Sequence, residues 1–253
     1  MRTNLKIDEL KELLPKREPF SKEELRGFFS KKGIDLSNEN LDVRINRLKA
    51  KGIIVNVGRG WYRTNDKKIF EPGLTPTLKK ISSLLKKEFP YLNYALWSTN
   101  WLNELTTLQL FRNIYIIEVE AGSEDAVFRT IKESFPHTTF LDPKETEWEN
   151  YKTERSENII IKTMISESPK VKYRTMSITK LEKIMVDLYC DKLLRTIFSG
   201  ELANIYMEVC KNYVLNFTTL LSYAGRRGKK TEIWEYIKSL DILEEPTIQM
   251  IEI

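Results

Sequence analysis

The stretch that decides the predicted fold is residues 21–63. It reads, in order, SKEELRGFF (21–29), LSNENLDVRINRLKAKG (36–52) and IIVNVGRGWYR (53–63). Ser21 and Glu24 match the S-x-x-E capping box, in which each side chain bonds the other residue's free backbone N–H at a helix start. The apolar residues that follow, three and four apart, share one helical face; they are Leu25, Phe28 and Phe29. Gly33 supplies the left-handed stop that is typical of a helix C-terminus.

A second helix is predicted from the cap residue Ser37 to a stop at Gly52. Its buried stripe comes from apolar residues four and three apart, namely Leu41, Ile45 and Leu48. The face opposite that stripe carries Asn40, Val43, Asn46 and Arg47, and its flanks carry Arg44, Lys49 and Lys51. Asn and Arg side chains make paired hydrogen bonds to adenine and guanine edges, and a valine contacts a thymine methyl group. The exposed faces of this helix therefore suit a DNA major groove.

A short hairpin follows the second helix. Residues 53–57 alternate as a half-buried strand, Gly58-Arg59-Gly60 forms a tight turn, and residues 61–63 return. Two helices followed by a hairpin predict a winged helix-turn-helix, with Arg59 at the tip of the wing and Arg63 at its base. The predicted DNA contacts are Asn40, Val43, Arg44, Asn46, Arg47, Lys51, Arg59 and Arg63. The alternative interpretation is a solvated amphipathic helix beside an ordinary hairpin, with arginines that serve solubility.

The positive charge of the chain is concentrated in this segment. Residues 1–67 carry 16 of the 41 Lys and Arg residues and 10 of the 36 Asp and Glu residues, a balance of +6. Residues 68–253 are left with −1, so the net charge of +5 arises entirely from the first quarter of the chain. Localised positive charge attracts phosphates and releases their counterions, and it favours a nucleic-acid partner independently of the helix pattern.

The remainder of the chain predicts a larger mixed α/β domain. The polar stretch after the hairpin places the boundary between a domain of residues 1–67 and a domain of residues 74–253. Short apolar strands are predicted at residues 94–97, 114–119, 138–141 and 159–164. Strands that alternate with helices indicate an α/β sheet, and the pattern after Ser177 is helical to the end. The predicted fold class is therefore α+β or α/β, with several helices closing the chain.

Composition excludes several functional classes. No apolar run approaches the ~20 residues of a membrane span, the N-terminus lacks the apolar stretch of a signal peptide, and a cytoplasmic location is expected. His137 is the only histidine and Cys190 and Cys210 are the only cysteines, so no metal site or disulfide framework is expected. No P-loop, G-x-G-x-x-G or G-x-S-x-G motif is present. We expect neither a cofactor nor catalysis.

Carboxylates offer two weaker patterns. Glu118 and Glu120 alternate at the end of a predicted strand and would face one side, so a nuclease of the restriction-enzyme type remains an alternative. Such a nuclease site needs a lysine two residues after its strand glutamate, but the residue two positions after Glu120 is Gly122. Asp187 and Asp191 lie four apart on one helix face, which we interpret as a solvated edge. The stretch from Gly225 to Lys230 has two interpretations, a joint between helices or a basic contact with a partner.

The layout as a whole resembles the AbiEi-type antitoxins of bacterial abortive-infection toxin–antitoxin systems. The resemblance rests on the G-R-G-W-Y-R hairpin, on SITKLEKIMVDLYCD (177–191) and on LLSYAGRRGK late in the chain. It implies a transcriptional autorepressor and an antitoxin that neutralises a nucleotidyltransferase toxin. Because one winged domain has a small footprint, two copies on an inverted repeat in the protein's own promoter are expected. The predicted partner-binding residues are Lys180, Lys183, Arg226 and Arg227. A winged-helix adaptor for protein contacts is the alternative from another class.

Overall fold

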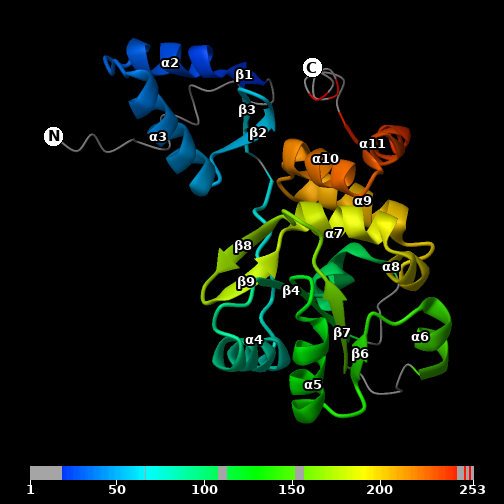
Figure 1. Cartoon of the computed structure of the whole chain (residues 1–253). Helices are drawn as coiled ribbons and strands as arrows, with labels where there is room; N and C mark the ends of the chain where they lie inside the picture. The colour runs from blue at the N-terminus through cyan, green and yellow to red at the C-terminus, as the bar shows by residue number, and fades with distance from the viewer. Residues whose placement is uncertain are drawn as a thin grey trace.

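The computed structural model describes residues 19–65, 67–107, 113–151 and 157–243, and residues 248 and 251 individually. The chain has a mixed α/β fold (Figure 1). Its buried apolar residues form two separate hydrophobic cores. The smaller core comes from residues 20–62 and the larger from residues 78–237. The prediction of a mixed fold that ends in several helices is confirmed. The spacing of Leu5, Leu10, Leu13 and Leu14 also predicts a helix over residues 4–14, which lies outside the described residues.

The N-terminal segment is two helices and a small sheet. Its elements are β1 (Phe20–Ser21), α2 (Lys22–Lys31), α3 (Asn38–Ala50), β2 (Ile54–Gly58) and β3 (Trp61–Thr64). The capping box forms as the sequence predicts, since the Ser21 N–H donates to Glu24 Oε2 at 2.6 Å and the Glu24 N–H donates to Ser21 Oγ at 3.1 Å. Gly33 has a φ of +72° after α2, which suits a residue without Cβ. The strands lie in the order β1-β3-β2, all antiparallel.

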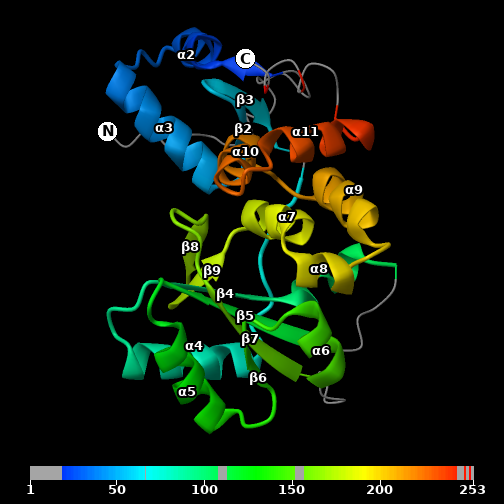
Figure 2. The same cartoon turned by 45° about the vertical axis from the view of Figure 1, so that its right-hand side comes forward.

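The N-terminal segment is attached to the rest of the chain at two places. Lys68 bridges Tyr213, where the Lys68 N–H donates to Asn212 O at 2.8 Å and the Val214 N–H donates to Lys68 O at 3.0 Å. The ammonium group of Lys67 also donates to the carbonyl of Cys210. In addition, β2 lies against a C-terminal helix, α10 (Phe217–Arg226), as Figure 2 shows.

The body is built on a six-stranded sheet of order β6-β7-β5-β4-β9-β8. Its strands are β4 (Tyr94–Ser98), β5 (Asn113–Val119), β6 (Thr139–Leu141), β7 (Glu157–Thr163), β8 (Lys170–Tyr173) and β9 (Met176–Thr179). Strands β5, β6 and β7 are mutually parallel, as are β4 and β9. The pairs β4–β5 and β8–β9 are antiparallel. The central strand β5 is buried along its whole length, which explains its uninterrupted apolar run.

Helices cover both faces of this sheet (Figures 1 and 2). The remaining elements are α4 (Pro76–Glu88), the 3₁₀ helix η1 (Thr99–Leu105), α5 (Glu124–Ser134), α6 (Glu145–Tyr151), α7 (Leu181–Cys190), α8 (Lys192–Ile197), α9 (Leu202–Asn212) and α11 (Lys230–Ser239). Two residues of β5 contact helices on opposite faces of the sheet. Tyr115 hydrogen-bonds Thr75, the cap of α4, at 2.8 Å, whereas Glu118 contacts Lys183 of α7. Among the described residues, no helix combines the length and apolarity needed to cross a bilayer.

One predicted helix begins later than the sequence indicates. The prediction placed residues 177–191 in one helix, but residues 176–179 form β9 and α7 starts at Leu181. Ile178 pairs with Leu96 of β4 on one side and with Val171 of β8 on the other. Two strand neighbours therefore override the helical periodicity of this short segment.

Candidate functional site

The predicted DNA-contacting face of α3 is exposed. Its opposite side is buried against α2 and the small sheet, where Leu41 is 0%, Ile45 2% and Leu48 2% exposed. The residues predicted to meet bases are exposed, namely Asn40, Val43, Asn46 and Arg47. Val43 is 48% exposed and is the apolar member of this otherwise polar face. The amphipathic pattern of the sequence therefore describes the actual orientation of α3.

The N-terminal half of α3 is held by its own cap residue and by side chains of α2. The Asn40 N–H donates to the cap Ser37 Oγ at 3.3 Å. Lys22 forms an ion pair with Asp42 at 2.6 Å, and the guanidinium group of Arg26 donates to Asn38 Oδ1. Polar contacts between the two helices, added to the buried stripe, fix the axis of α3 relative to α2.

The predicted arginine contacts fall into two groups. Arg47 and Arg59 are exposed, as is Lys51 at the C-terminal cap of α3. Arg44 and Arg63 are half-buried, and the Arg44 guanidinium lies 5.2 Å from the centroid of the Phe29 ring. This cation–π contact joins α3 to α2. Arg44 therefore has a structural contact in addition to any external one.

The turn of the hairpin lies beside the start of α2. Gly60 has a φ of +78°, and its carbonyl accepts a hydrogen bond from the Lys22 N–H at 3.2 Å. Arg59 is exposed at this turn. The hairpin tip is thus held against α2, with the Arg59 side chain directed to solvent.

A second group of charged residues lies inside the body, where the sequence did not predict one. Lys183 of α7 is 0% exposed and its ammonium group contacts two carboxylates, Glu118 Oε1 at 2.5 Å and Asp187 Oδ2. Asp187 Oδ1 accepts a hydrogen bond from Tyr223 at 3.0 Å and lies 3.4 Å from Arg227 Nη1. These five residues, the buried ion cluster, join β5, α7 and the end of α10.

Burial and charge pairing set the pKa values within this cluster. Burial raises the pKa of Glu118, and the neighbouring Lys183 partly offsets that rise. For Lys183, burial disfavours the charged form, but the carboxylates of Asp187 and Glu118 outweigh it and hold its pKa above the ordinary value. Burial also raises the pKa of Tyr223, so its hydroxyl remains a donor to Asp187 at neutral pH. The cluster is therefore a fixed arrangement of paired charges.

A cavity of about 230 Å³ lies beside the buried ion cluster. Three adjacent parallel strands each place a charged residue there at or just after their carboxyl ends, namely Glu118 (β5), Lys162 (β7) and Asp142 (after β6). Lys162 pairs with Asp191 and lies 3.4 Å from Asp142. Open α/β sheets bind ligands at this position. Here, however, each lining carboxylate already contacts a cation, and the described residues contain no group of three or more potential metal ligands.

The structure corrects several interpretations of the body. Lys183 cannot contact a partner protein because its side chain is fully buried. Asp187, 4% exposed, belongs to the buried ion cluster and not to a solvated edge. Glu118 and Glu120 do not form a joint site, since Glu118 is buried with Lys183, whereas Glu120 is exposed and accepts from the Asn93 N–H. These corrections share one cause: α7 is covered by the sheet on one side and by other helices on the other.

The other predicted partner-binding residues lie nearer the surface. Lys180 is the half-buried cap residue of α7, without a side-chain capping bond. Arg226 is exposed and forms an ion pair with Glu167, while Arg227 is half-buried against Asp187. The stretch after Gly225 is a joint between α10 and α11, in which Gly228 has a φ of +65°. Arg227 therefore has a structural role within this joint.

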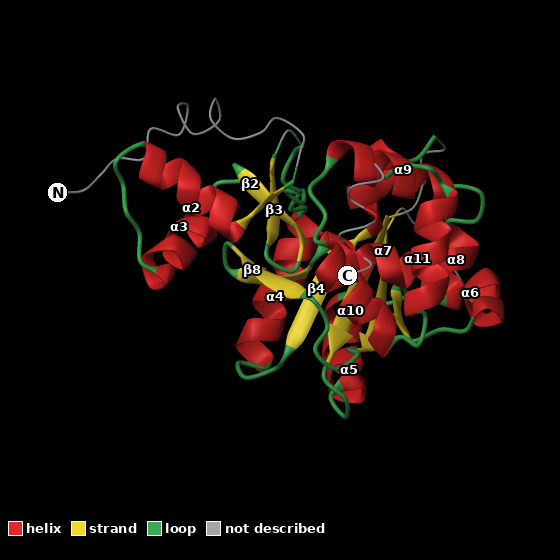
Figure 3. Cartoon of the chain, turned by 90° about the horizontal axis from the view of Figure 1, so that it is seen from above, coloured by secondary structure: helices red, strands yellow, loops and turns green. Residues whose placement is uncertain are grey.

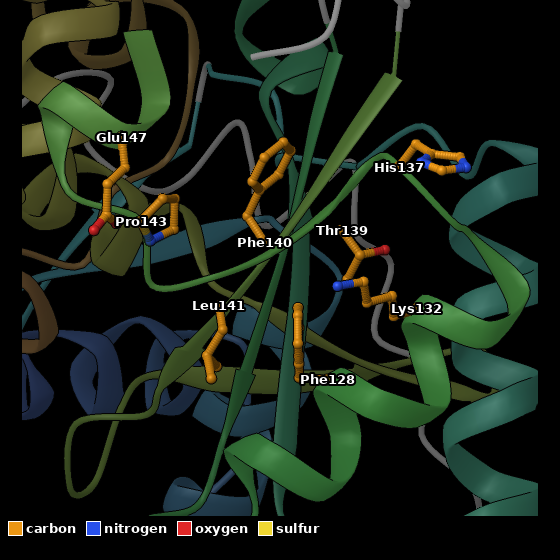
Figure 4. A pocket seen from close by; sticks show the side chains of 8 residues that line it. All are labelled: Phe128, Lys132, His137, Thr139, Phe140, Leu141, Pro143 and Glu147. Carbon is orange, nitrogen blue, oxygen red and sulfur yellow. The ribbon is translucent and has the colours of Figure 1, made fainter. Parts of the chain in front are cut away.

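The groove in Figure 4 lies between α5, the edge strand β6 and α6. It has a volume of about 540 Å³, and it is lined by Phe128, Lys132, His137, Thr139, Phe140, Leu141, Pro143 and Glu147. His137, the only histidine, sits in a loop with a φ of +67°. Apolar side chains occupy the middle of the groove, and Glu147, the carboxylate of the lining, lies at the opposite end from His137 (Figure 4).

Comparison with known protein families matches residues 40–242 to a family of unknown function, DUF6577. The chain belongs to the DUF6577 family. The matched region begins inside α3 and ends after α11, so it includes residues of both hydrophobic cores. No curated protein is similar enough to this chain to count as a match.

Proposed function

We propose that this DUF6577 protein is a DNA-binding transcriptional regulator whose first segment is a winged helix-turn-helix. The observation that carries the proposal is the division of α3 into a buried stripe and an exposed face of Asn40, Val43, Asn46 and Arg47. The element order α2-α3-β2-β3 with strand order β1-β3-β2 agrees with that fold. The entire positive excess of the chain lies in the same segment.

We assign each predicted DNA-contacting residue a role according to the exposure of its side chain. Asn40, Asn46 and Arg47 are the base-contacting candidates, with Val43 against a thymine methyl group. We assign the exposed Lys51 and Arg59 to phosphate contacts, which position a protein without reading sequence. Arg44 and Arg63 would contact DNA from half-buried positions. The guanidinium group of Arg44 chiefly packs over the Phe29 ring. A single winged segment has a small footprint, so two copies on an inverted repeat are expected.

The test is a titration of duplex DNA from the protein's own upstream region against a random duplex of equal length. Arg47→Ala should weaken binding to the upstream duplex by about 5–150-fold, the equivalent of ~1–3 kcal/mol, and leave random binding almost unchanged. Arg59→Ala should weaken binding to both duplexes. Lys211→Ala on α9 is the matched control, since Lys211 is exposed and lies on the body. Equal affinities for all variants would refute the assignment.

We further propose that the body binds a protein partner, a nucleotidyltransferase toxin, in a cytoplasmic antitoxin role without catalysis. The resemblance of the layout to AbiEi-type antitoxins supports this. Lys180 and Arg226 remain the candidate contacts, whereas Lys183 is fully buried and the half-buried Arg227 is paired with Asp187. Co-expression with the product of an adjacent nucleotidyltransferase gene tests the proposal: rescue of growth supports it, and toxicity that persists with abundant folded protein contradicts it. An adaptor without DNA affinity would bind a partner but fail the titration.

A further inference from the structure

One hairpin of the body is basic, whereas the body as a whole is close to neutral. Residues 68–253 have a net charge of −1, yet residues 168–181 contain four Lys and Arg residues and no Asp or Glu. The cations of this stretch are Lys170, Lys172, Arg174 and Lys180. Within this stretch, β8, β9 and the turn between them are together called the basic hairpin, and Lys180 follows it as the cap residue of α7.

The basic hairpin presents its cations to solvent at one edge of the large sheet. β8 is the last strand in the sheet order, so no strand of the described chain pairs with its outer edge. Lys172 and Arg174 are exposed, and the Arg174 guanidinium lies 5.7 Å from the centroid of the Tyr173 ring. Lys170 differs, because it is held by the Asn93 side chain. Two cations, Lys172 and Arg174, are therefore available at this edge.

The basic hairpin lies beside α3. It is directly below the C-terminal end of α3 in Figures 1 and 2, and the two remain adjacent in the view from above (Figure 3). The C-terminal end of α3 is itself basic, with exposed Lys49 and Lys51. On the other side of the hairpin, Lys86 of α4 donates to the carbonyl of Thr175 in the turn. The basic C-terminal end of α3 and the basic hairpin are thus neighbours, and the turn of the hairpin is also joined to α4.

Protection against edge-to-edge aggregation is the ordinary reason for lysines on an edge strand. That reason accounts for lysines on β8, but it does not account for Arg174, which lies in the turn beyond the strand. The opposite edge strand, β6, is only three residues long, so it needs no such protection, and it carries no cation. Of the two edge strands, the one that carries cations is the one that adjoins α3.

We propose that the basic hairpin is a second nucleic-acid contact, which binds the phosphate backbone of the duplex that α3 reads. The inference rests on the proposed DNA-binding function and extends it from the N-terminal segment to the body. Lys172 and Arg174 each neutralise one phosphate beyond the bases that α3 contacts. The body then contributes affinity without sequence preference and fixes the direction in which the duplex leaves α3.

Salt dependence tests this contact directly. The variant is Lys172→Gln with Arg174→Gln, and the control is Lys132→Gln with Lys211→Gln, which removes the same charge from exposed sites on α5 and α9. The logarithm of the binding constant falls with the logarithm of salt concentration by about 0.9 per phosphate contact in duplex DNA. The hairpin variant should lower that slope by about 1.8, equally on upstream and random duplexes. The control should leave the slope unchanged.

The outcomes separate the two proposals. A parent chain that binds no duplex refutes both. A parent chain that binds, loses specificity with Arg47→Ala, and keeps its slope in the hairpin variant refutes the hairpin contact alone. The substituted side chains are exposed, so the variants should keep the parent circular dichroism spectrum. As a second readout, hydroxyl-radical footprinting should show the parent protecting backbone beside the α3 site and the hairpin variant losing only that flank.

Discussion

Replacing Lys183 with Met should be among the most destabilising single changes in the body. The substitution keeps the unbranched, flexible stem of the side chain and removes the ammonium group that lies between Glu118 and Asp187. Both carboxylates are buried, 6% and 4% exposed, so neither can turn to solvent. Breaking a buried ion pair by removing one partner typically costs about 3–5 kcal/mol. For a domain of this size, each kcal/mol lowers Tm by roughly 2–4 °C.

The assay is urea unfolding followed by tryptophan fluorescence, with thermal unfolding as a second measure. We expect the loss of 3–5 kcal/mol to appear as a lower midpoint with little change in the slope of the transition. The uncompensated charge of the two carboxylates causes this loss. Lys183→Met combined with Glu118→Gln and Asp187→Asn should therefore recover a large part of the lost unfolding free energy. Surface charge removal by Lys211→Met supplies the control. A single variant within about 1 kcal/mol of the parent would refute the importance of the buried ion cluster.

Two further predictions follow from burial and capping. The burial of Cys210 raises its thiol pKa to about 12, so its contribution to stability is complete below pH 9 and declines as pH rises from 9 toward 12. Thiol reagents at pH 8 should therefore modify the half-buried Cys190 before Cys210, and rapid labelling of Cys210 in the folded Cys190→Ser variant would contradict this. Ser21→Ala removes the Oγ acceptor of the capping box and should cost about 0.5–2 kcal/mol by urea unfolding. An unchanged midpoint would show that the cap contributes nothing measurable.

Local sequence signals predicted the N-terminal segment well. The capping box at Ser21, the glycine stop at Gly33 and the stripe from Leu41 to Leu48 each depend on residues within one turn or one helix. Such signals need no knowledge of distant neighbours. The strands β4, β5, β6 and β7 were also predicted to within a few residues, because buried parallel strands read as short apolar runs.

The buried ion cluster was missed because its parts are far apart in the chain. Glu118 and Lys183 are separated by 65 residues and meet only once α7 packs on the sheet. A local signal was nevertheless present, since Lys183 and Asp187 are four apart in the otherwise apolar helix sequence LEKIMVDLYC. An oppositely charged pair with that spacing can stabilise an exposed helix. In a helix with apolar residues on every side, the same pair indicates an internal salt bridge.

The attachment of the N-terminal segment to the body affects how the protein would bind DNA. A winged segment on a free linker would read its site independently of the body, and the basic hairpin would contribute little. Here Lys68 forms a strand-like bridge to Tyr213, Lys67 donates to Cys210, and β2 lies against α10. Three contacts within a short stretch of chain restrict rotation of α3 about the linker. Cations of the hairpin and of α3 can then act on one duplex without first losing the orientational freedom of two independent modules.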